Sequence, residues 1–563
     1  MLEWNVKVNQ VSALILLFFS FLSFFFSLIM MESGCLYVEW EVFNINSCGV
    51  VMSVVFDWMS LMFLSLVSYI SSMVFFYSGS YMKGDINITR FMYLVVFFVM
   101  CMWLMIISPN LISVLLGWDG LGLISYVLVV YYQHEKSAEA GMLTVLSNRV
   151  GDVGILLGIG MMSGVGGWSF VFYSGVGLGG LTPWVVGFVI LAGLTKSAQF
   201  PFSAWLPAAM AAPTPVSALV HSSTLVTAGV YILIRFSELM SSFQMSVLLF
   251  VSSFTMLMAS LAASVEYDLK KIIALSTLSQ LGLMMAVLAI GRADLAFFHL
   301  IMHALFKALL FMCAGSIIHN CGGCQDIRFM GCLYKFMPIT SNMLYLANLA
   351  LIGFPFLAGY YSKDLALEVF FSSNLNKCCL LVLVLSTFLT SNYSFRLYYY
   401  LLLEEFSGSV VCNISEDMKM IFPMYGLGVG AVVGGSCFSL ITYCAPPMIC
   451  LNSFFKMLAI AVSFYGVFLG TRFTSMKNDP SRAFFLSSMW YIRFLSNRIP
   501  GYSLVVGKYF YKYVDTSWLE FYGARGLGST FSNFSRFLQL MQENKVKIYL
   551  VVMFMWFIFL ICI

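Results

Sequence analysis

The chain has 563 residues, of which 61% are hydrophobic and only 10% are charged, and its net charge is +4. Soluble domains carry about 25% charged residues, so this composition excludes an ordinary soluble protein. The hydrophobic residues form runs of roughly 17–25, long enough for a helix to cross about 30 Å of hydrocarbon. The alternating strands of a membrane β-barrel are absent. We therefore predict an all-α, polytopic membrane protein and expect no nucleic-acid partner.

We predict about fifteen transmembrane helices. Their approximate limits are 11–31, 53–77, 91–107, 110–131, 141–163, 183–210, 217–236, 243–264, 270–290, 293–316, 338–373, 378–402, 420–442, 455–472 and 547–563. The first run lacks a small-residue cleavage site, so we interpret it as a retained helix rather than a signal peptide.

Two spans contain helix-breaking residues near their middle. The span 183–210 has two prolines beyond Lys196, and the span 338–373 has Gly, Pro and Gly before Lys363. Interrupted helices at corresponding places indicate a transporter built from two inverted repeats. The predicted segments are N-terminal helices (1–90), a first antiporter-like half (91–236), a second half (243–402), additional helices (403–472), a lateral amphipathic segment (473–546) and a terminal anchor helix (547–563).

Ionisable residues inside the predicted spans are the candidates for function. They are Asp119, Arg149, Asp152, Lys196, Lys307, Lys363 and Asp364. Each costs roughly 3 kcal/mol on insertion scales, so together they would cost about 20 kcal/mol if left unpaired. A folded domain has a net stability of only about 5–15 kcal/mol. These residues must therefore be paired or hydrated, and paired, hydrated, titratable groups in mid-membrane are what proton conduction requires.

The first group of candidates surrounds Lys196. Asp119 is the only carboxylate of its span, and Arg149 and Asp152 are three residues apart on one helix face. A carboxylate near a desolvated lysine favours its charged form, so moving Asp119 would switch whether Lys196 holds its proton. The alternatives are a purely structural Arg149–Asp152 ion pair and a lysine that snorkels to the membrane surface.

A second group lies further along the chain. His299, His303 and Lys307 are spaced by four, so a helix stacks them on one face. His221 is a candidate proton relay, because imidazole gives and accepts protons near neutral pH; a satisfied core histidine is the alternative. Lys270 flanks a helix start and is a candidate link between the two halves. No further ligand completes a metal site around the two histidines of the 299–307 run.

The loop after this run contains Cys321 and Cys324. A lone Cys-x-x-Cys pair can hold a metal or act in redox chemistry, but no second pair with zinc spacing follows. The glycines between the two cysteines indicate a turn. We therefore predict no metal here and leave the role of these cysteines open.

The segment 472–547 is basic, with eleven Lys or Arg and four Asp or Glu. Phe485, Met489, Ile492 and Leu495 recur near helical spacing. We predict a helix along the membrane surface followed by an anchoring span. The alternative is a loop whose positive charges only set the topology.

Several motifs resemble the NADH–ubiquinone oxidoreductase chain 5 family, the distal antiporter-like subunits of mitochondrial respiratory complex I. They are Gly-Trp-Asp-Gly-Leu-Gly-Leu-Ile-Ser-Tyr (117–126), Asn-Arg-Val-Gly-Asp (148–152), Lys-Ser-Ala-Gln-Phe-Pro (196–201), Pro-Thr-Pro-Val-Ser-Ala-Leu-Val-His (213–221), His-Ala-Leu-Phe-Lys-Ala-Leu-Leu-Phe (303–311) and Tyr-Ser-Lys-Asp (361–364). The likeness is specific from about residue 90 to 400 and loose elsewhere.

This resemblance implies roles for the candidate residues. Lys196 would be the central pumping lysine with the acid at 119 as its partner, and Arg149 and Asp152 would modulate that pair. The link between the half-channels would be formed by His221, His299, His303 and Lys307, and the exit by Lys363 and Asp364. The family usually has Glu where this chain has Asp119, and sixteen spans where we predict fifteen.

The resemblance also implies the surroundings of the chain. It would be a multi-pass protein of the mitochondrial inner membrane and a subunit of a proton-translocating NADH:ubiquinone reductase. Its partners would be other membrane-arm subunits, with the lateral helix along neighbouring antiporter-like subunits, and lipids such as cardiolipin. NADH, FMN, iron–sulfur clusters and ubiquinone would bind in partner subunits, with no cofactor and no redox chemistry in this chain. A cation/proton antiporter subunit and a structural membrane scaffold are the alternatives.

Overall fold

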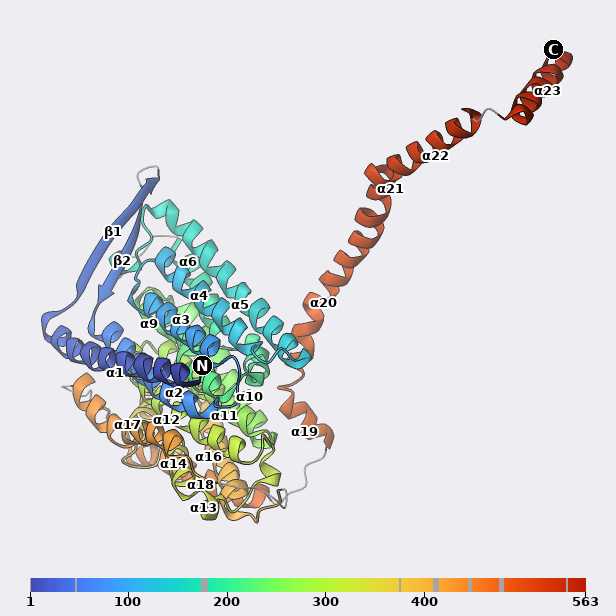
Figure 1. The fold of residues 1–563 in the computed structure, drawn as a ribbon. Coiled ribbons are helices and arrows are strands. Elements are labelled where there is room, and N and C mark those ends of the chain that lie inside the picture. Colours follow the sequence, from blue (N-terminus) through green and yellow to red (C-terminus); the bar gives the residue numbers. More distant parts are fainter. Residues whose placement is uncertain are drawn as a thin grey trace. The chain divides into compact units, whose positions relative to one another are not determined.

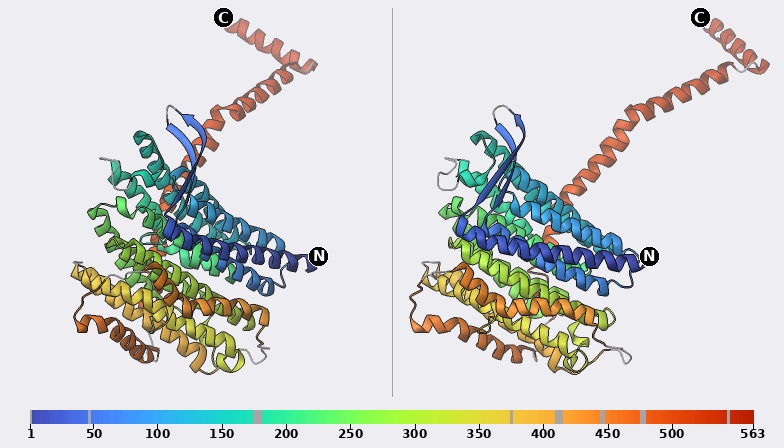
Figure 2. Two further views of the ribbon diagram at one scale, coloured as in Figure 1. Left: turned by 90° about the vertical axis from the view of Figure 1, so that its left-hand side faces the viewer. Right: turned by 60° about the vertical axis from the view of Figure 1, so that its left-hand side comes forward.

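The computed structural model describes residues 2–45, 48–173, 181–373, 376–408, 415–443, 448–474, 480–542 and 545–563 (Figure 1). The chain divides into two compact units, residues 1–493 and 494–563. The first unit is a bundle of helices that run side by side (Figure 2). It contains all of the predicted site residues.

The first part of the bundle alternates long helices with one hairpin and one broken helix. Its elements are α1 (Leu2–Ser33), β1 (Leu36–Ile45), β2 (Cys48–Phe56), α2 (Trp58–Tyr81), α3 (Ile88–Ile107), α4 (Leu111–Val129), α5 (Glu135–Met162), α6 (Thr182–Lys196), α7 (Trp205–Ala208), α8 (Thr214–Val216), the π-helix η6 (Ser217–Thr224) and α9 (Leu225–Arg235).

The remaining elements of the bundle are again almost entirely helical. They are α10 (Ser242–Val265), α11 (Leu269–Ala289), α12 (Ala293–Asn320), α13 (Leu333–Phe336), α14 (Pro338–Ile352), α15 (Ala358–Ser372), α16 (Lys377–Tyr398), α17 (Met418–Thr442), α18 (Ser453–Thr474) and α19 (Pro480–Ser487). Helix α20 (Ile492–Phe510) leads into the second unit.

The prediction of a polytopic helical membrane protein is confirmed. Among the described residues, twelve helices are long and apolar enough to cross a membrane. They match twelve of the fifteen predicted spans. Two further predicted spans are the broken helices, α6 with α7 and α14 with α15. The last one is α23 (Val546–Cys562), which has 17 residues.

The hairpin is an element that the sequence interpretation missed. Strands β1 and β2 pair antiparallel from Leu36↔Phe56 to Ile45↔Cys48, with an irregularity in register between Glu41 and Phe43. Residues 50–56 are apolar apart from Ser53, and only Asp57 separates them from α2. The length of the apolar run therefore led us to count residues 53–56 as part of that span. The description all-α is therefore corrected to a helical bundle with one two-stranded sheet.

A partly buried ion pair anchors the start of α2 to the end of α9. The Arg235 guanidinium binds the Asp57 carboxylate, with Nη2 donating to Oδ1 over 2.9 Å, and Arg235 Nε also donates to Tyr231 Oη (3.0 Å). Burial alone would raise the pKa of Asp57, but the hydrogen bonds and charge of Arg235 outweigh it and lower this pKa. The pair therefore persists at neutral pH.

Both predicted helix breaks are present. Helix α6 ends at Lys196, and the chain stays irregular until a short helical turn begins at Phe202. Pro201 lies in this stretch and cannot donate a backbone hydrogen bond. Helix α14 ends at Ile352, and the following Gly353 has a φ of +93°, a left-handed conformation that glycine adopts without strain. Helix α15 then begins at Ala358.

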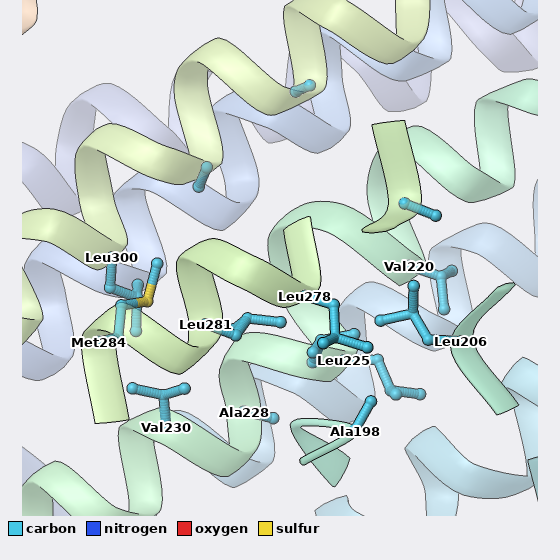
Figure 3. Packing of buried hydrophobic residues seen from close by; sticks show 14 of the residues in the cluster. Ala198, Leu206, Val220, Leu225, Ala228, Val230, Leu278, Leu281, Met284 and Leu300 are labelled. Atoms are coloured by element: carbon cyan, nitrogen blue, oxygen red, sulfur yellow. The ribbon is translucent and has the colours of Figure 1, made fainter. Parts of the chain in front are cut away.

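The centre of the bundle is formed by α9 with η6, α11 and α12, whose spans are completely buried. Figure 3 shows apolar side chains from these helices packed together, among them Leu225, Leu278, Leu281 and Leu300. The peripheral helices instead expose many apolar side chains, as a lipid-facing surface requires. Polar side chains in the centre are therefore removed from both water and lipid.

The second unit consists of the rest of α20, the π-helix η10 (Tyr511–Leu519), α21 (Glu520–Tyr522), α22 (Ala524–Gln542) and α23. In α22, Leu527, Phe531, Phe534, Leu538 and Met541 recur every three or four residues. This helix is amphipathic, and the apolar helix α23 follows it. The pattern over residues 485–495 does not form one helix, because a turn with positive φ at Met489 separates α19 from α20.

Candidate functional site

Seven predicted site residues are almost completely buried in the first unit. Their exposure is 0% for Lys196, His303 and Lys307, 1% for His221 and His299, and 5% for Lys270 and Lys363. Ionisable groups buried in a membrane bundle are costly unless they have polar partners. The contacts of each residue therefore indicate what it can do.

Lys196 lies at the last turn of α6, directly before the helix break. Its Nζ donates to the main-chain oxygen of Trp118 over 3.3 Å and lies 4.9 Å from the centre of the Trp118 ring. Gly229 lets α9 approach closely, because a Cβ there would lie 3.3 Å from the Lys196 Cβ and 2.7 Å from the Gly193 oxygen. The lysine is thus held between α4 and α9.

The acidic groups of this region meet at one arginine. Arg149 Nη1 lies 3.1 Å from Asp152 Oδ2 and 3.5 Å from Asp119 Oδ1. Among the described residues, Asp119 forms no ion pair with Lys196. The expected partnership of these two residues is therefore not a direct contact in this structure.

Trp118 connects Lys196 with Asp152, a link that the sequence interpretation missed. Its indole Nε1 donates to Asp152 Oδ1 over 2.8 Å, while its carbonyl accepts from Lys196. The ring is fully buried. The only sequence signal was its position beside Asp119 in the Gly-Trp-Asp motif, which does not reveal the direction of the indole.

His221 lies in the π-helix η6, an irregular winding that is frequent at functional sites. Its ring packs edge-on against Trp205, with ring centres 6.2 Å apart. Neither ring nitrogen has a hydrogen-bond partner within the described part of the chain. A buried imidazole in this state offers both nitrogens to a mobile partner such as water.

His299, His303 and Lys307 lie on one face of α12, as their spacing predicts. His299 Nδ1 lies 2.9 Å from Ser362 Oγ on α15, and its Nε2 lies 3.3 Å from Gln280 Oε1 on α11. The two imidazole centres are 6.3 Å apart. His303 has no hydrogen-bond partner among the described residues.

Two further lysines, Lys307 on α12 and Lys363 at the second break, are bound by hydroxyl and carbonyl groups. Lys307 Nζ donates to Ser276 Oγ over 2.5 Å. Lys363 Nζ donates to Thr390 Oγ1 (2.9 Å) and to the Ile352 oxygen (3.3 Å) at the end of α14, where the exposed carbonyls of a helix attract positive charge. A small cavity of about 20 Å³ beside Lys363 and Asp364 is large enough for a water molecule.

Lys270 plays a similar capping role between α11 and the first break. Its Nζ donates to the main-chain oxygen of Ala212 over 3.2 Å. Lys271, the next residue, instead pairs with Asp268 at the surface. Lys270 thus joins the start of α11 to the chain at Ala212, which lies between the first break and η6.

The cysteine loop supplies no further site. Cys324 is half-buried, and its Sγ lies 3.9 Å from the main-chain oxygen of Asp326. Among the described residues, no group of three His, Cys, Asp or Glu side chains converges as metal ligands do.

Interrupted membrane helices are typical of secondary transporters, and in this chain each interruption adjoins a buried lysine. Comparison with known proteins supports this class. Residues 108–390 match the family described as NADH:quinone oxidoreductase/Mrp antiporter. Residues 40–92 match the N-terminus of NADH–ubiquinone oxidoreductase (complex I) chain 5, and residues 393–563 match the C-terminus of NADH dehydrogenase subunit 5.

Curated relatives identify the particular family. The chain is 51% identical to NADH-ubiquinone oxidoreductase chain 5 of Anopheles gambiae, over 93% of both chains. It is 50% identical to the Aedes aegypti protein of the same name, over 100% of this chain and 99% of that one. The chain belongs to the NADH-ubiquinone oxidoreductase chain 5 family.

A solved structure supports the fold alone. The structure of the Mrp complex from Dietzia sp. has a chain that superposes with a TM-score of 0.73 at 23% identity. The match covers 90% of this chain and 60% of that chain.

Proposed function

We propose that this chain conducts protons across the mitochondrial inner membrane as a membrane-arm subunit of complex I. The observation that carries the proposal is the file of buried, titratable residues between the two helix breaks, from Lys196 through His221, His303 and Lys307 to Lys363. A scaffold gains nothing from such groups, because each one costs desolvation energy.

In the first half, Arg149 acts as the switch. It binds Asp119 and Asp152 together, and Asp152 is joined to Lys196 through Trp118. If Arg149 leaves Asp152, the field of this carboxylate on Lys196 is no longer compensated, and the charged form of the lysine is favoured. If Arg149 returns, Lys196 is favoured to release its proton.

In the centre, water completes the path. The ring nitrogens of His221 and His303 have no partner within the described part of the chain, and buried polar groups are normally hydrogen-bonded to protein or to ordered water. Water molecules at these rings would allow imidazole to take a proton on one nitrogen and release another proton from the second. Lys270 and His299 position the helices on either side.

At the far end, Lys363 and Asp364 form the exit. The ammonium of Lys363 faces hydroxyl and carbonyl oxygens, and Asp364 lies beside the small cavity that also borders Thr387 and Ser463. A proton that leaves Lys363 can pass to water in this cavity with Asp364 as the next acceptor.

The organisation into inverted repeats over 91–236 and 243–402 is part of this proposal. The break after α6 and the break between α14 and α15 are its corresponding interruptions, and each one adjoins a lysine of the path. The additional helices over 403–472 would pack around the second half. The N-terminal segment (1–90) would pack against the central helices of the bundle through α2.

Partner subunits would supply the energy that drives proton transfer, and one of them would cover a charged face of this chain. NADH, FMN, iron–sulfur clusters and ubiquinone would bind in those subunits, and none of them in this chain. The side chains of Asp119 and Arg149 are 36% and 45% exposed in the isolated chain, at the middle of α4 and α5. Charges at that depth are costly in lipid, so a neighbouring membrane-arm subunit would cover them.

The basic segment 473–546 would lie along neighbouring antiporter-like subunits and bind anionic lipids such as cardiolipin. Its charge balance of eleven basic against four acidic residues over 472–547 favours a negatively charged surface. The amphipathic pattern of α22 supports a position at the membrane interface. Helix α23 would then anchor the end of the chain.

Replacement of Lys196 tests the proposal. Complex I that carries Lys196→Ala is reconstituted into vesicles, and proton uptake is measured against NADH oxidation. We expect proton uptake per NADH to fall at least two-fold at normal assembly, because the central titratable group is lost. Lys271→Ala is the matched control, since Lys271 is a surface residue one position from Lys270.

Two outcomes contradict the proposal. If Lys196→Ala complexes assemble and pump like the control, the buried charges serve a scaffold. If the chain exchanges a cation for protons in vesicles without other complex I subunits, a free cation/proton antiporter is the better description.

A further inference from the structure

Tyr393 is a buried tyrosine that none of the roles above uses. It lies on α16 with 2% exposure, and its hydroxyl lies 3.4 Å from Ser279 Oγ on α11. On the same helix, one turn earlier, Thr390 accepts a hydrogen bond from Lys363 Nζ. The Tyr393 hydroxyl thus reaches α11, and the helix that carries it also binds the lysine of the second break.

Helix α11 continues this row of hydroxyls towards Lys307. Ser276 Oγ accepts the hydrogen bond of Lys307 Nζ, and Ser279 lies one turn further along the same face of α11. Ser276, Ser279, Tyr393 and Thr390 therefore form a row of four hydroxyl groups on two helices, with Lys307 bound at its first member and Lys363 at its last.

Three of these hydroxyls direct their protons back to their own helices. Ser276 donates to the Ile273 oxygen (2.7 Å), Ser279 to the Ser276 oxygen (2.9 Å) and Thr390 to the Thr387 oxygen (2.7 Å). Serine and threonine commonly form such bonds within helices. Tyrosine cannot reach the carbonyls of its own preceding turn in this way, so the Tyr393 hydroxyl is the one of these four whose proton is not held by a carbonyl of its own helix.

We propose that the Tyr393 hydroxyl relays protons from Lys307 to Lys363. The inference rests on the proposed function and adds a specific route to it. Hydroxyl groups both donate and accept hydrogen bonds. Each hydroxyl accepts a proton on its oxygen as it passes its own proton to the next group, so no hydroxyl remains charged. Lys307 ends neutral, and Lys363 ends as an ammonium.

The route is closed in this structure. The three helix-bonded hydroxyls must rotate away from their carbonyls before the row conducts, and the 3.4 Å contact between Ser279 and Tyr393 must shorten. A water molecule must also bridge the Tyr393 and Thr390 hydroxyls, which share no hydrogen bond among the described residues. A competing route from α12 runs through His299 and Ser362, which lie 2.9 Å apart and end one residue before Lys363. The two routes differ in their need for the tyrosine hydroxyl.

Tyr393→Phe removes only this hydroxyl and keeps the ring that fills the core. In reconstituted complex I we expect at least a two-fold loss of proton uptake per NADH oxidised, together with a changed solvent deuterium isotope effect on proton uptake. A merely structural tyrosine would not alter that isotope effect. Tyr398→Phe is the matched control on the same helix, because its hydroxyl makes no hydrogen bond within the described residues.

Normal pumping and an unchanged isotope effect in Tyr393→Phe overturn the relay and favour the route through His299. Lys307→Met in the same assay separates this result from a failure of the proposed function. If Lys307→Met loses pumping while Tyr393→Phe does not, only the relay is wrong; if both pump normally, the conduction path itself is wrong. Should Tyr393→Phe fail to assemble, Ser279→Ala removes the partner hydroxyl and must give the same loss.

Discussion

Lys196 and Asp152 are joined through a single residue, the buried Trp118. The lysine binds the carbonyl of this residue, and the carboxylate accepts its N–H. A hydrogen bond to a charged group contributes about 1.5–3 kcal/mol. The orientation of Asp152 relative to Lys196, and hence its effect on the lysine's charge, therefore depends on this N–H donor as well as on Arg149.

Trp118→Phe tests this dependence. Phenylalanine keeps an aromatic ring beside Lys196 and leaves the main-chain carbonyl in place, but it cannot donate to Asp152. We expect normal assembly and at least a two-fold slower proton uptake in reconstituted complex I. Trp184→Phe is the control, because Trp184 is exposed on α6. Equal proton uptake in both variants would show that the indole hydrogen bond has no part in conduction.

Residue-level predictions from the sequence succeeded where spacing alone decides the geometry. The shared face of His299, His303 and Lys307 follows from the helical repeat. Contacts such as Trp118–Asp152 and Ser279–Tyr393 join different helices, so their formation depends on how the helices pack. No local pattern in the sequence encodes that packing.

At the scale of the helices, the proposed path depends on two helix breaks. One follows α6, and the other lies between α14 and α15. Both were predictable, because proline and glycine interrupt apolar runs next to a lysine. The hairpin β1–β2 was not, since its second strand is as apolar as the helix that follows it. Run length separates membrane spans from loops, but it does not separate a short apolar strand from the start of a span.

The second break also requires close contact between its two helices. A Cβ on Gly359 in α15 would lie only 1.7 Å from the main-chain oxygen of Ala350 in α14. Gly359→Ala must therefore push the helices apart and move Lys363, which lies one turn further along α15. Such overpacking typically costs about 1–3 kcal/mol.

We accordingly expect Gly359→Ala to lower the melting temperature of the purified complex and to impair proton uptake. Gly160→Ala is the matched control, because a Cβ at Gly160 meets no atom within 4 Å. If the two variants have the same melting temperature and the same proton uptake, the close approach of α14 and α15 is not needed for the path.

At the scale of the whole molecule, a fully buried centre is surrounded by helices with apolar outer faces. Three central spans, Thr214–Arg235, Leu269–Ala289 and Ala293–Asn320, are buried over their apolar stretch and carry five of the seven most deeply buried site residues, namely His221, Lys270, His299, His303 and Lys307. The hydrophobic surroundings keep these groups away from bulk water, so protons must enter and leave at the few polar openings. Composition and family resemblance were sufficient to predict this arrangement.

The central claim is that water connects these titratable groups into one path. A map of the assembled complex that resolves ordered water tests it most directly. We predict water within hydrogen-bond distance of the ring nitrogens of His221 and His303, and a hydrogen-bonded row from Lys196 to Lys363 in at least one state of the enzyme. Dry gaps at both histidines in every state of a turning-over enzyme would contradict the account.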